Sequence, residues 1–137
     1  MKFYSKTNII KHNYLIINLI FIVIILLIFS YSIIFSKQND NYPIECIHKQ
    51  ITGKICATCG LSHSFSEIVR GNFKEAKTLN ENGIYIFAFF FIQLITRLLV
   101  SAILILNFST INYLIVSDSI FSFLLFLLCF QNLFVIW

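Results

Sequence analysis

Charged residues are scarce in this sequence of 137 residues. Only 12% of the residues are charged, whereas 58% are hydrophobic and the mean hydropathy is +0.86. About a quarter of the residues of a soluble domain are charged, so the composition excludes an ordinary water-soluble fold. The net charge of +4 forms no basic stripe interleaved with aromatic residues, and we therefore expect no nucleic-acid partner.

Common catalytic signatures are also missing. The sequence has no nucleophile–base pair, no Gly-rich phosphate loop and no carboxylates at metal-binding spacing, so we assign no catalytic residue. The first apolar run is longer than the 7–15 residues of a signal-peptide core, and no small-x-small cleavage site follows it. We expect a retained signal anchor.

Long apolar runs are what the sequence has in abundance. They cover residues 13–36, 83–106 and 112–134, and a helix needs about 20 residues to cross a hydrocarbon core of roughly 30 Å. Backbone groups in lipid must be satisfied internally, so each run predicts a helix rather than a strand. We expect an all-α membrane protein with three transmembrane helices, a basic flank at residues 1–12 and a polar loop at residues 37–82. The lipid bilayer is its first partner.

The basic residues favour one orientation in the membrane. Lys2, Lys6 and Lys11 crowd the flank before the first helix, with no acidic residue among them. The loop carries more basic residues in total, but they are spread over some forty positions. Positive charge next to the first helix usually dominates topology, so we expect the N-terminus inside, and the loop and the C-terminus outside.

Two charges interrupt the second and third apolar runs. Arg97 lies about eight residues before the end of one, and Asp118 about seven residues after the start of the next. A tight hairpin at residues 107–110 would place both roughly 10–12 Å from the turn, since a helix rises 1.5 Å per residue. An intramembrane ion pair is the first interpretation. Snorkelling of Arg97 to the interface and a proton or ion pathway are the alternatives.

The loop predicts two short helices, at residues 61–70 and 73–79. Apolar side chains of the first share one face and polar side chains share another: Leu61, Phe65, Ile68 and Val69 on the apolar face, and His63, Glu67 and Arg70 on the polar face. Gly71 is a helix-stop signal, and Asn72 followed by Glu75 resembles a capping box. We expect two amphipathic helices that lie at the membrane interface and roof the bundle.

The loop also carries three cysteines and a histidine, with the spacing Cys46-x9-Cys56-x2-Cys59-x3-His63. Three chemistries fit this set. A structural disulfide suits an outside location, three thiolates and an imidazole form a complete zinc set, and a cysteine at a helix start suits a redox-active pair. Zinc is therefore a candidate cofactor. Cys129 is the candidate fourth cysteine, near the outer end of the last helix, although we favour the interpretation of a small apolar residue in a lipid-facing run.

This loop resembles the bacterial membrane proteins known as domain of unknown function 2752. The family pattern has a cysteine, then C-P-x-C-G-x-T-R, a short helix, G-[DN], F-x-x-A, Asn-Pro and a transmembrane helix. The matching positions are Cys46, Cys56, Cys59, Gly60, Gly71, Asn72, Phe73, Ala76 and Asn80, and Asn132 echoes an Arg-Asn pair near the end of the last helix. The resemblance implies a bacterial inner-membrane protein and brings no established activity.

Some family positions differ in this chain. The Pro after the second cysteine is Ala57, the Thr-Arg pair is Ser62-His63, the Pro after the Asn is Glu81, and the terminal Arg is Gln131. Two arginines of the family are thus absent together. If those arginines bind an anionic group in the family, this chain binds it differently or not at all, and His63 could supply a cation at low pH or serve as a ligand.

Three functions follow from these observations. The first is a non-catalytic small subunit or assembly protein whose cysteines hold the shape of an extracytoplasmic loop, with a membrane protein as its partner. The second is a membrane thiol–disulfide oxidoreductase that uses Cys56 and Cys59. The third is a zinc-type site formed by Cys46, Cys56, Cys59 and His63. We favour the first because no catalytic set accompanies the cysteines.

Overall fold

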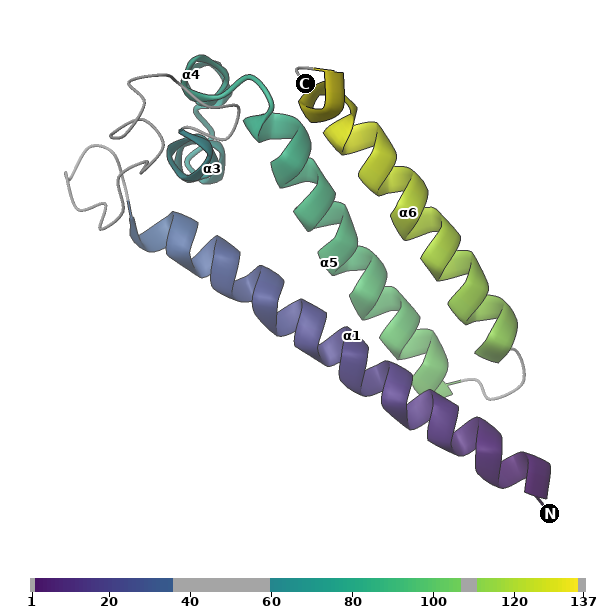
Figure 1. Ribbon diagram of the computed structural model, residues 1–137. Helices are drawn as coiled ribbons and strands as arrows, with labels where there is room; N and C mark the ends of the chain where they lie inside the picture. Colours follow the sequence, from purple (N-terminus) through teal and green to yellow (C-terminus); the bar gives the residue numbers. More distant parts are fainter. Residues whose placement is uncertain (1, 36–59, 107–110, 136–137) are drawn as a thin grey trace, which may run out of the picture.

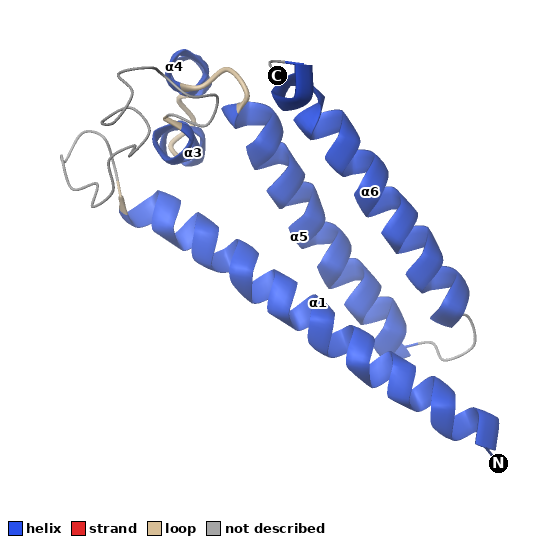
Figure 2. Ribbon diagram, viewed as in Figure 1, coloured by secondary structure: helices blue, strands red, loops and turns tan. Residues whose placement is uncertain are grey.

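The computed structural model describes residues 2–35, 60–106 and 111–135, with side chains described from residue 8 to residue 132 of these ranges. Its helices are α1 (Lys2–Ile34), α3 (Leu61–Val69), α4 (Phe73–Leu79), α5 (Gly83–Leu106) and α6 (Ile111–Val135). Every regular element in these ranges is a helix (Figures 1 and 2). The predicted all-α class is confirmed.

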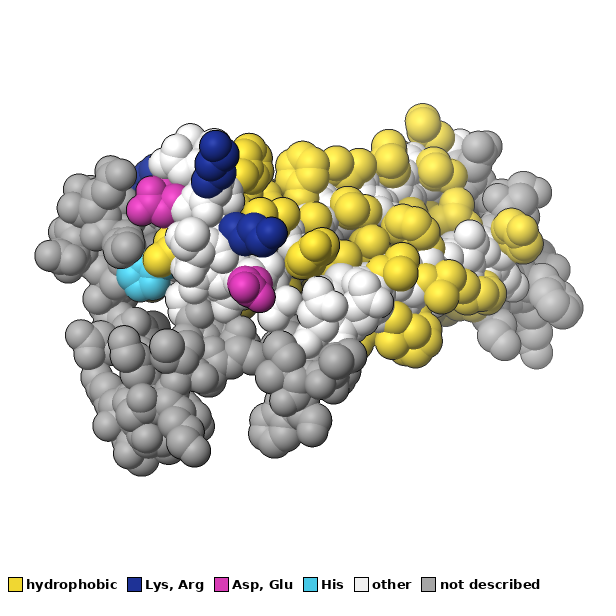
Figure 3. Space-filling model, turned by 90° about the horizontal axis from the view of Figure 1, so that it is seen from above, with side chains coloured by type: hydrophobic (Ala, Val, Ile, Leu, Met, Phe, Trp, Pro, Cys, Tyr) yellow, Lys and Arg dark blue, Asp and Glu magenta, His cyan; other side chains and the backbone are white. Residues whose placement is uncertain are grey.

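Three of the helices are long and apolar enough to cross a bilayer. These spans are Asn8–Ile34, Gly83–Leu106 and Ile111–Asn132. Seen from above, charged side chains gather over α3 and α4, and the long helices present hydrophobic side chains (Figure 3). Apolar surface of this extent is stable in lipid and unstable in water. The chain is therefore a multi-pass membrane protein.

Helix α5 lies between the other two long helices, α1 and α6 (Figure 1). Its buried residues are Gly83, Ile86, Gln93, Val100 and Leu104. Their separations of 3, 7, 7 and 4 positions follow the seven-residue period that places a narrow seam against neighbouring helices. The exposed apolar residues of α5, such as Leu98, Leu99 and Ile103, face the lipid.

Helix α1 begins at Lys2, eleven positions before the expected start of the first transmembrane helix. Its 33 residues make it roughly 50 Å long at 1.5 Å per residue, which exceeds the thickness of the hydrocarbon core. The lysine-bearing flank is thus a helical extension of the span. The sequence prediction was based on hydrophobicity alone, and hydrophobicity locates the span rather than the end of the helix.

The short helices α3 and α4 lie at the end of the bundle where α1 finishes and α5 begins (Figure 1). Five consecutive residues of α3, from Ser64 to Ile68, are buried. Five in a row cover every side of a helix with 3.6 residues per turn, so the middle of α3 is buried on all sides. Glu67, from the predicted polar face, is only 1% exposed, whereas Val69, from the predicted apolar face, is 39% exposed.

Hydrophobic clusters close both ends of the bundle. At the α3 end, Phe65, Ile68, Ala76 and Ile86 form a buried core. Aromatic rings extend this core, with Phe65 edge-on to Phe87 at a centroid distance of 5.4 Å. At the opposite end, Val100 and Leu104 of α5 pack with Ile111 of α6. The turn at residues 107–110 lies outside the described residues.

Candidate functional site

The three loop cysteines of the sequence prediction, Cys46, Cys56 and Cys59, lie outside the described residues. Of the four residues in that candidate set, the structure describes His63, which is half-buried on α3. Both ends of the cysteine-bearing segment are described, namely Phe35 after α1 and Gly60 before α3. The structure therefore shows how the base of the loop is held.

Two side chains of α3 fasten it to the end of α1. Ser66 donates from Oγ to the backbone oxygen of Phe35 at 2.9 Å. Arg70 donates from Nη2 to the backbone oxygen of Ile33 at 3.2 Å, and from Nη1 to the backbone oxygen of Ser66 at 2.8 Å. The last carbonyls of a helix have no partner within it and carry partial negative charge, so a hydroxyl and a guanidinium stabilise them. The first end of the loop is thereby fixed to α3.

The other end of the loop is fixed at Gly60. Its φ is 76°, a left-handed conformation that glycine adopts without steric cost. A Cβ at this position would lie 2.6 Å from the backbone oxygen of Leu79, the last residue of α4. Glycine is required here for both reasons, and the loop consequently re-enters the fold against the end of α4.

The turn between α3 and α4 is a Schellman motif. The N–H of Gly71 bonds the carbonyl of Ile68 at 2.9 Å, and the N–H of Asn72 bonds the carbonyl of Glu67 at 2.9 Å, which is the pairing that defines the motif. Gly71 has φ 84°. Gly71 therefore ends α3 as a left-handed residue just past its C-cap.

The side chain of Asn72 differs from the expected capping box. Asn72 is the N-cap residue of α4, but its side chain makes no cap hydrogen bond. Its Nδ2 instead donates to Oε2 of Glu67 at 2.8 Å. A buried carboxylate needs a hydrogen-bond donor more than an exposed helix start does, because the helix start is open to water. The capping-box prediction is wrong for this reason.

A close helix contact joins α3 to α5. A Cβ on Gly83, the first residue of α5, would lie 2.0 Å from Oγ of Ser64, so only glycine allows this approach. Ala76 of α4 is fully buried in the same region. Asn80 accepts the backbone N–H of Asn82 at 2.9 Å through its Oδ1 and shapes the link to α5. Phe73, in contrast, is 56% exposed.

A second site lies inside the bundle, where Arg97 of α5 meets Asp118 of α6. The Nη1 atom of Arg97 lies 2.5 Å from Oδ2 of Asp118, and their side chains are 12% and 2% exposed. The arginine points inward and does not snorkel to the interface. Tyr14 of α1 donates its hydroxyl to the same oxygen of Asp118, so one carboxylate joins all three long helices.

The remaining bonds of Arg97 complete this buried polar cluster. Its guanidinium donates to Oδ1 of Asn18 at 3.1 Å and to Oγ of Ser122 at 2.7 Å, and it lies 5.6 Å from the ring centroid of Phe21. Asn18 is fully buried and reaches Oγ of Ser101 at 3.4 Å. A guanidinium has five donors in a rigid fork, which allows a single side chain to bond two neighbouring helices. The hydrogen bonds of this cluster therefore connect α1, α5 and α6 to one another.

Sequence reasoning missed the α1 half of this cluster. Tyr14 and Asn18 are four positions apart and therefore share one helix face. Both are polar residues in a run that is predominantly apolar and carries no charge. A polar pair at this spacing within a transmembrane run was the available signal, because polar groups inside a bilayer seek partners on other helices.

Two residues singled out in the last helix lie on α6. Cys129 is half-buried with a free thiol, and Asn132 is exposed near the end of α6. Within residues 2–35, 60–106 and 111–135, no group of three or more His, Cys, Asp or Glu side chains converges as a metal site would. The three candidate thiolate ligands fall outside these ranges.

Residues 46–94 match the family described as "Protein of unknown function (DUF2752)". The family resemblance is confirmed for this segment. It covers the cysteine-bearing segment, α3, α4 and the first half of α5. Of the family positions that the structure describes there, Gly60 holds one end of the loop, and Gly71, Asn72, Ala76 and Asn80 shape α3, α4 and their links. No curated protein and no solved structure matches the chain.

Proposed function

We propose that this chain is a non-catalytic small subunit or assembly protein of the bacterial inner membrane, which presents a cysteine-stabilised loop to a membrane-protein partner. The observation that carries the proposal is the fastening of both ends of the loop. Phe35 is held by Ser66, and Gly60 is held against Leu79. We call α3 and α4 together the platform. A segment that is anchored at both ends on this platform forms a surface whose shape depends on contacts within the segment.

The buried polar cluster supports a structural role for the bundle. Arg97 bonds Tyr14, Asn18, Asp118 and Ser122. Such bonds fix the positions of α1, α5 and α6 relative to one another. A rigid bundle in turn fixes the platform, because α3 is attached to the ends of α1 and α5.

The orientation in the proposal is N-terminus inside and loop outside. The ends of α1 and α6 place the C-terminus at the same end of the bundle as α3 and α4 (Figure 1). A location of the loop outside the cytoplasm permits a disulfide among Cys46, Cys56 and Cys59. A periplasmic reporter enzyme fused after Trp137 is expected to be active, whereas activity of a cytoplasmic reporter there contradicts this orientation.

Single Cys→Ser substitutions test the proposed role of the loop. Replacing Cys46, Cys56 or Cys59 is expected to lower the amount of protein in the membrane several-fold, as the loop loses a covalent constraint that a small fold depends on. Cys129→Ser is the matched control and is expected to keep the parental amount. The measurement is quantitative immunoblotting of membranes, with intact mass after alkylation, with and without reductant, to record which thiols are bonded.

Two outcomes contradict the proposal. Full membrane abundance of all three loop variants would show that the cysteines do not hold the fold. Cycling of Cys56 and Cys59 between thiol and disulfide in graded redox buffers, with unchanged abundance, would favour the oxidoreductase instead.

A further inference from the structure

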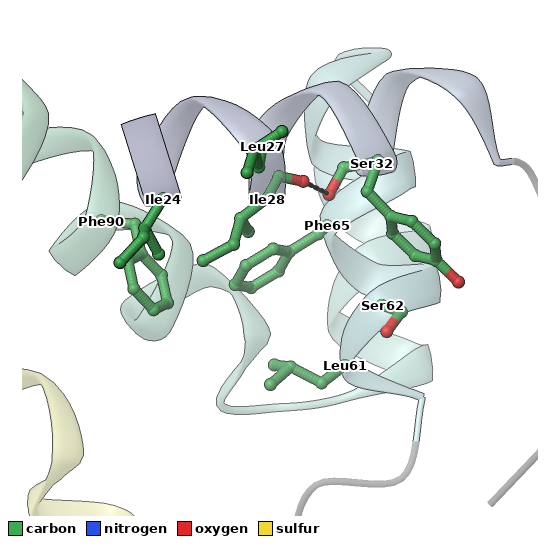
Figure 4. A pocket seen from close by; sticks show the side chains of 9 residues that line it. Ile24, Leu27, Ile28, Ser32, Leu61, Ser62, Phe65 and Phe90 are labelled. Carbon is green, nitrogen blue, oxygen red and sulfur yellow. Dashed lines mark hydrogen bonds between the residues drawn. The ribbon is translucent and has the colours of Figure 1, made fainter. Parts of the chain in front are cut away.

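A cavity of about 500 Å³ lies where α1, α3 and α5 meet, within the range of roughly 300–1,000 Å³ that is typical of ligand pockets. α1 supplies one wall with Ile24, Leu27 and Ile28, α3 lies across its end with Phe65, and α5 supplies Phe90 (Figure 4). Helices α1 and α5 separate toward the α3 end (Figure 1), and the cavity occupies the space between them.

The polarity of this cavity changes along its length. The end nearer the middle of the membrane has the aliphatic and aromatic side chains of Ile24 and Phe90, and the other end has Ser62 (Figure 4). Tyr31 also belongs to the lining. Ile24 and Tyr31 are seven helical positions apart, or roughly 10 Å. Tyr31 lies three residues from the end of the span at Ile34, which is the level at which tyrosines meet lipid headgroups.

The open side of the cavity faces the bilayer. Ile24 and Leu27 at its rim are 47% and 64% exposed, and both belong to a membrane span. An acyl chain can enter from this side without crossing a polar surface. Its ester-bearing end would then meet the hydroxyl end of the cavity, where lipid itself changes from hydrocarbon to polar groups.

We propose that this cavity is a binding site for one acyl chain of a membrane phospholipid, with the glycerol ester end at Tyr31 and Ser62 and the chain running past Phe65 toward Ile24 and Phe90. The bound chain fills the space that diverging α1 and α5 leave under α3. It therefore acts as part of the packing that supports the loop platform.

Photocrosslinking tests the site. The full-length protein is reconstituted in phosphatidylethanolamine–phosphatidylglycerol vesicles that contain a phosphatidylcholine with a diazirine on its acyl chain, then irradiated and mapped by mass spectrometry. Adducts are expected to concentrate on the α1 and α3 walls, at Ile24–Tyr31 and Leu61–Phe65, above the level at Leu124 and Leu128 of α6. Those two leucines are exposed to lipid and report non-specific labelling.

Two cavity-narrowing variants make the test specific. Ile28→Trp fills the cavity from α1, and Ser62→Phe narrows its hydroxyl end from α3 in case the first variant folds poorly. Each is expected to reduce labelling of the cavity walls several-fold, whereas Ile20→Trp, on the same helix but outside the cavity, leaves it unchanged. Equal labelling along all exposed helix faces, unchanged labelling in both cavity variants, or displacement of the lipid probe by an equimolar short-chain quinone would overturn the proposal.

Discussion

Loss of the Asp118 carboxylate should be the most damaging single change in the bundle. Asp118→Ala leaves the guanidinium of Arg97 buried without its counter-charge, and breaking a buried ion pair from one side costs about 3–5 kcal/mol. Hydrogen bonds between membrane helices average about 0.6 kcal/mol, with a maximum of about 1.7. The unpaired charge therefore dominates over the lost bond from Tyr14, and we expect the free energy of unfolding to fall by about 3–5 kcal/mol.

Asp118→Asn separates the charge from the hydrogen bonds. This variant keeps the shape of the side chain and its capacity to accept hydrogen bonds. If the charge is decisive, its free energy of unfolding should fall by nearly as much as that of Asp118→Ala. Ser119→Ala is the matched control, because Ser119 is the next residue on α6, is exposed, and donates its hydroxyl to the backbone oxygen of Ile115 within the same helix at 2.8 Å. Its effect should stay within about 0.5 kcal/mol.

Pulse proteolysis across an SDS titration in mixed micelles measures these differences as the fraction folded. The decisive comparison is the double variant Arg97→Leu, Asp118→Leu, since replacing both members of a buried pair with apolar residues is often neutral. We expect the double variant to be more stable than Asp118→Ala. A double variant that loses the sum of the two single losses, or an Asp118→Asn variant as stable as the parent, would refute the reasoning.

Three further predictions concern the fastening of the platform and the α1 side of the polar cluster, all measured by the same titration. Gly83→Ala should cost about 1–3 kcal/mol by overpacking, because its Cβ would lie 2.0 Å from the hydroxyl of Ser64; Ser64→Gly should restore part of the loss, and no rescue would contradict the contact. Gly60→Ala should lower the free energy of unfolding more than Gly71→Ala does. Both positions have positive φ, but only a Cβ at residue 60 would also meet a carbonyl oxygen, at 2.6 Å. Equal losses would indicate that backbone strain alone matters. Tyr14→Phe should cost about 0.6–1.7 kcal/mol, and a loss as large as that from removing the carboxylate would show that the hydroxyl does more than donate one bond.

The sequence predicted those parts of the fold that hydrophobicity and helix geometry determine. Three apolar runs gave three long helices, and counting residues from the hairpin turn brought Arg97 and Asp118 to matching depth. The pair lies 2.5 Å apart in the structure. The positions of α3 and α4 followed from periodicity and from the glycine that ends α3.

Tertiary contacts explain what the sequence did not predict. The helical periodicity places Glu67 on the polar face of α3, but its side chain is buried in the fold. Asn72, the cap residue of α4, donates a hydrogen bond to its carboxylate at 2.8 Å. A helical periodicity shows which residues share a face and not which faces are enclosed. In the same way, the i, i+4 spacing of Tyr14 and Asn18 marks a polar face on α1, but it does not show that their partner is a charge on another helix.

Helix α5 connects the two sites that this fold depends on. Its first residue, Gly83, packs against Ser64 of α3 at the loop end of the bundle. Arg97, fourteen positions later, bonds residues of α1 and α6. These positions are roughly 20 Å apart along one helix, and helices transmit position rigidly over that length. Because α1 is held near its middle by Arg97 and at its end by Ser66 and Arg70, its tilt relative to α5 is fixed at two points. The positions of Phe35 and Gly60, the described residues on either side of the cysteine-bearing segment, therefore follow in part from charges buried in the bundle. This coupling is a structural reason for an ion pair inside the membrane.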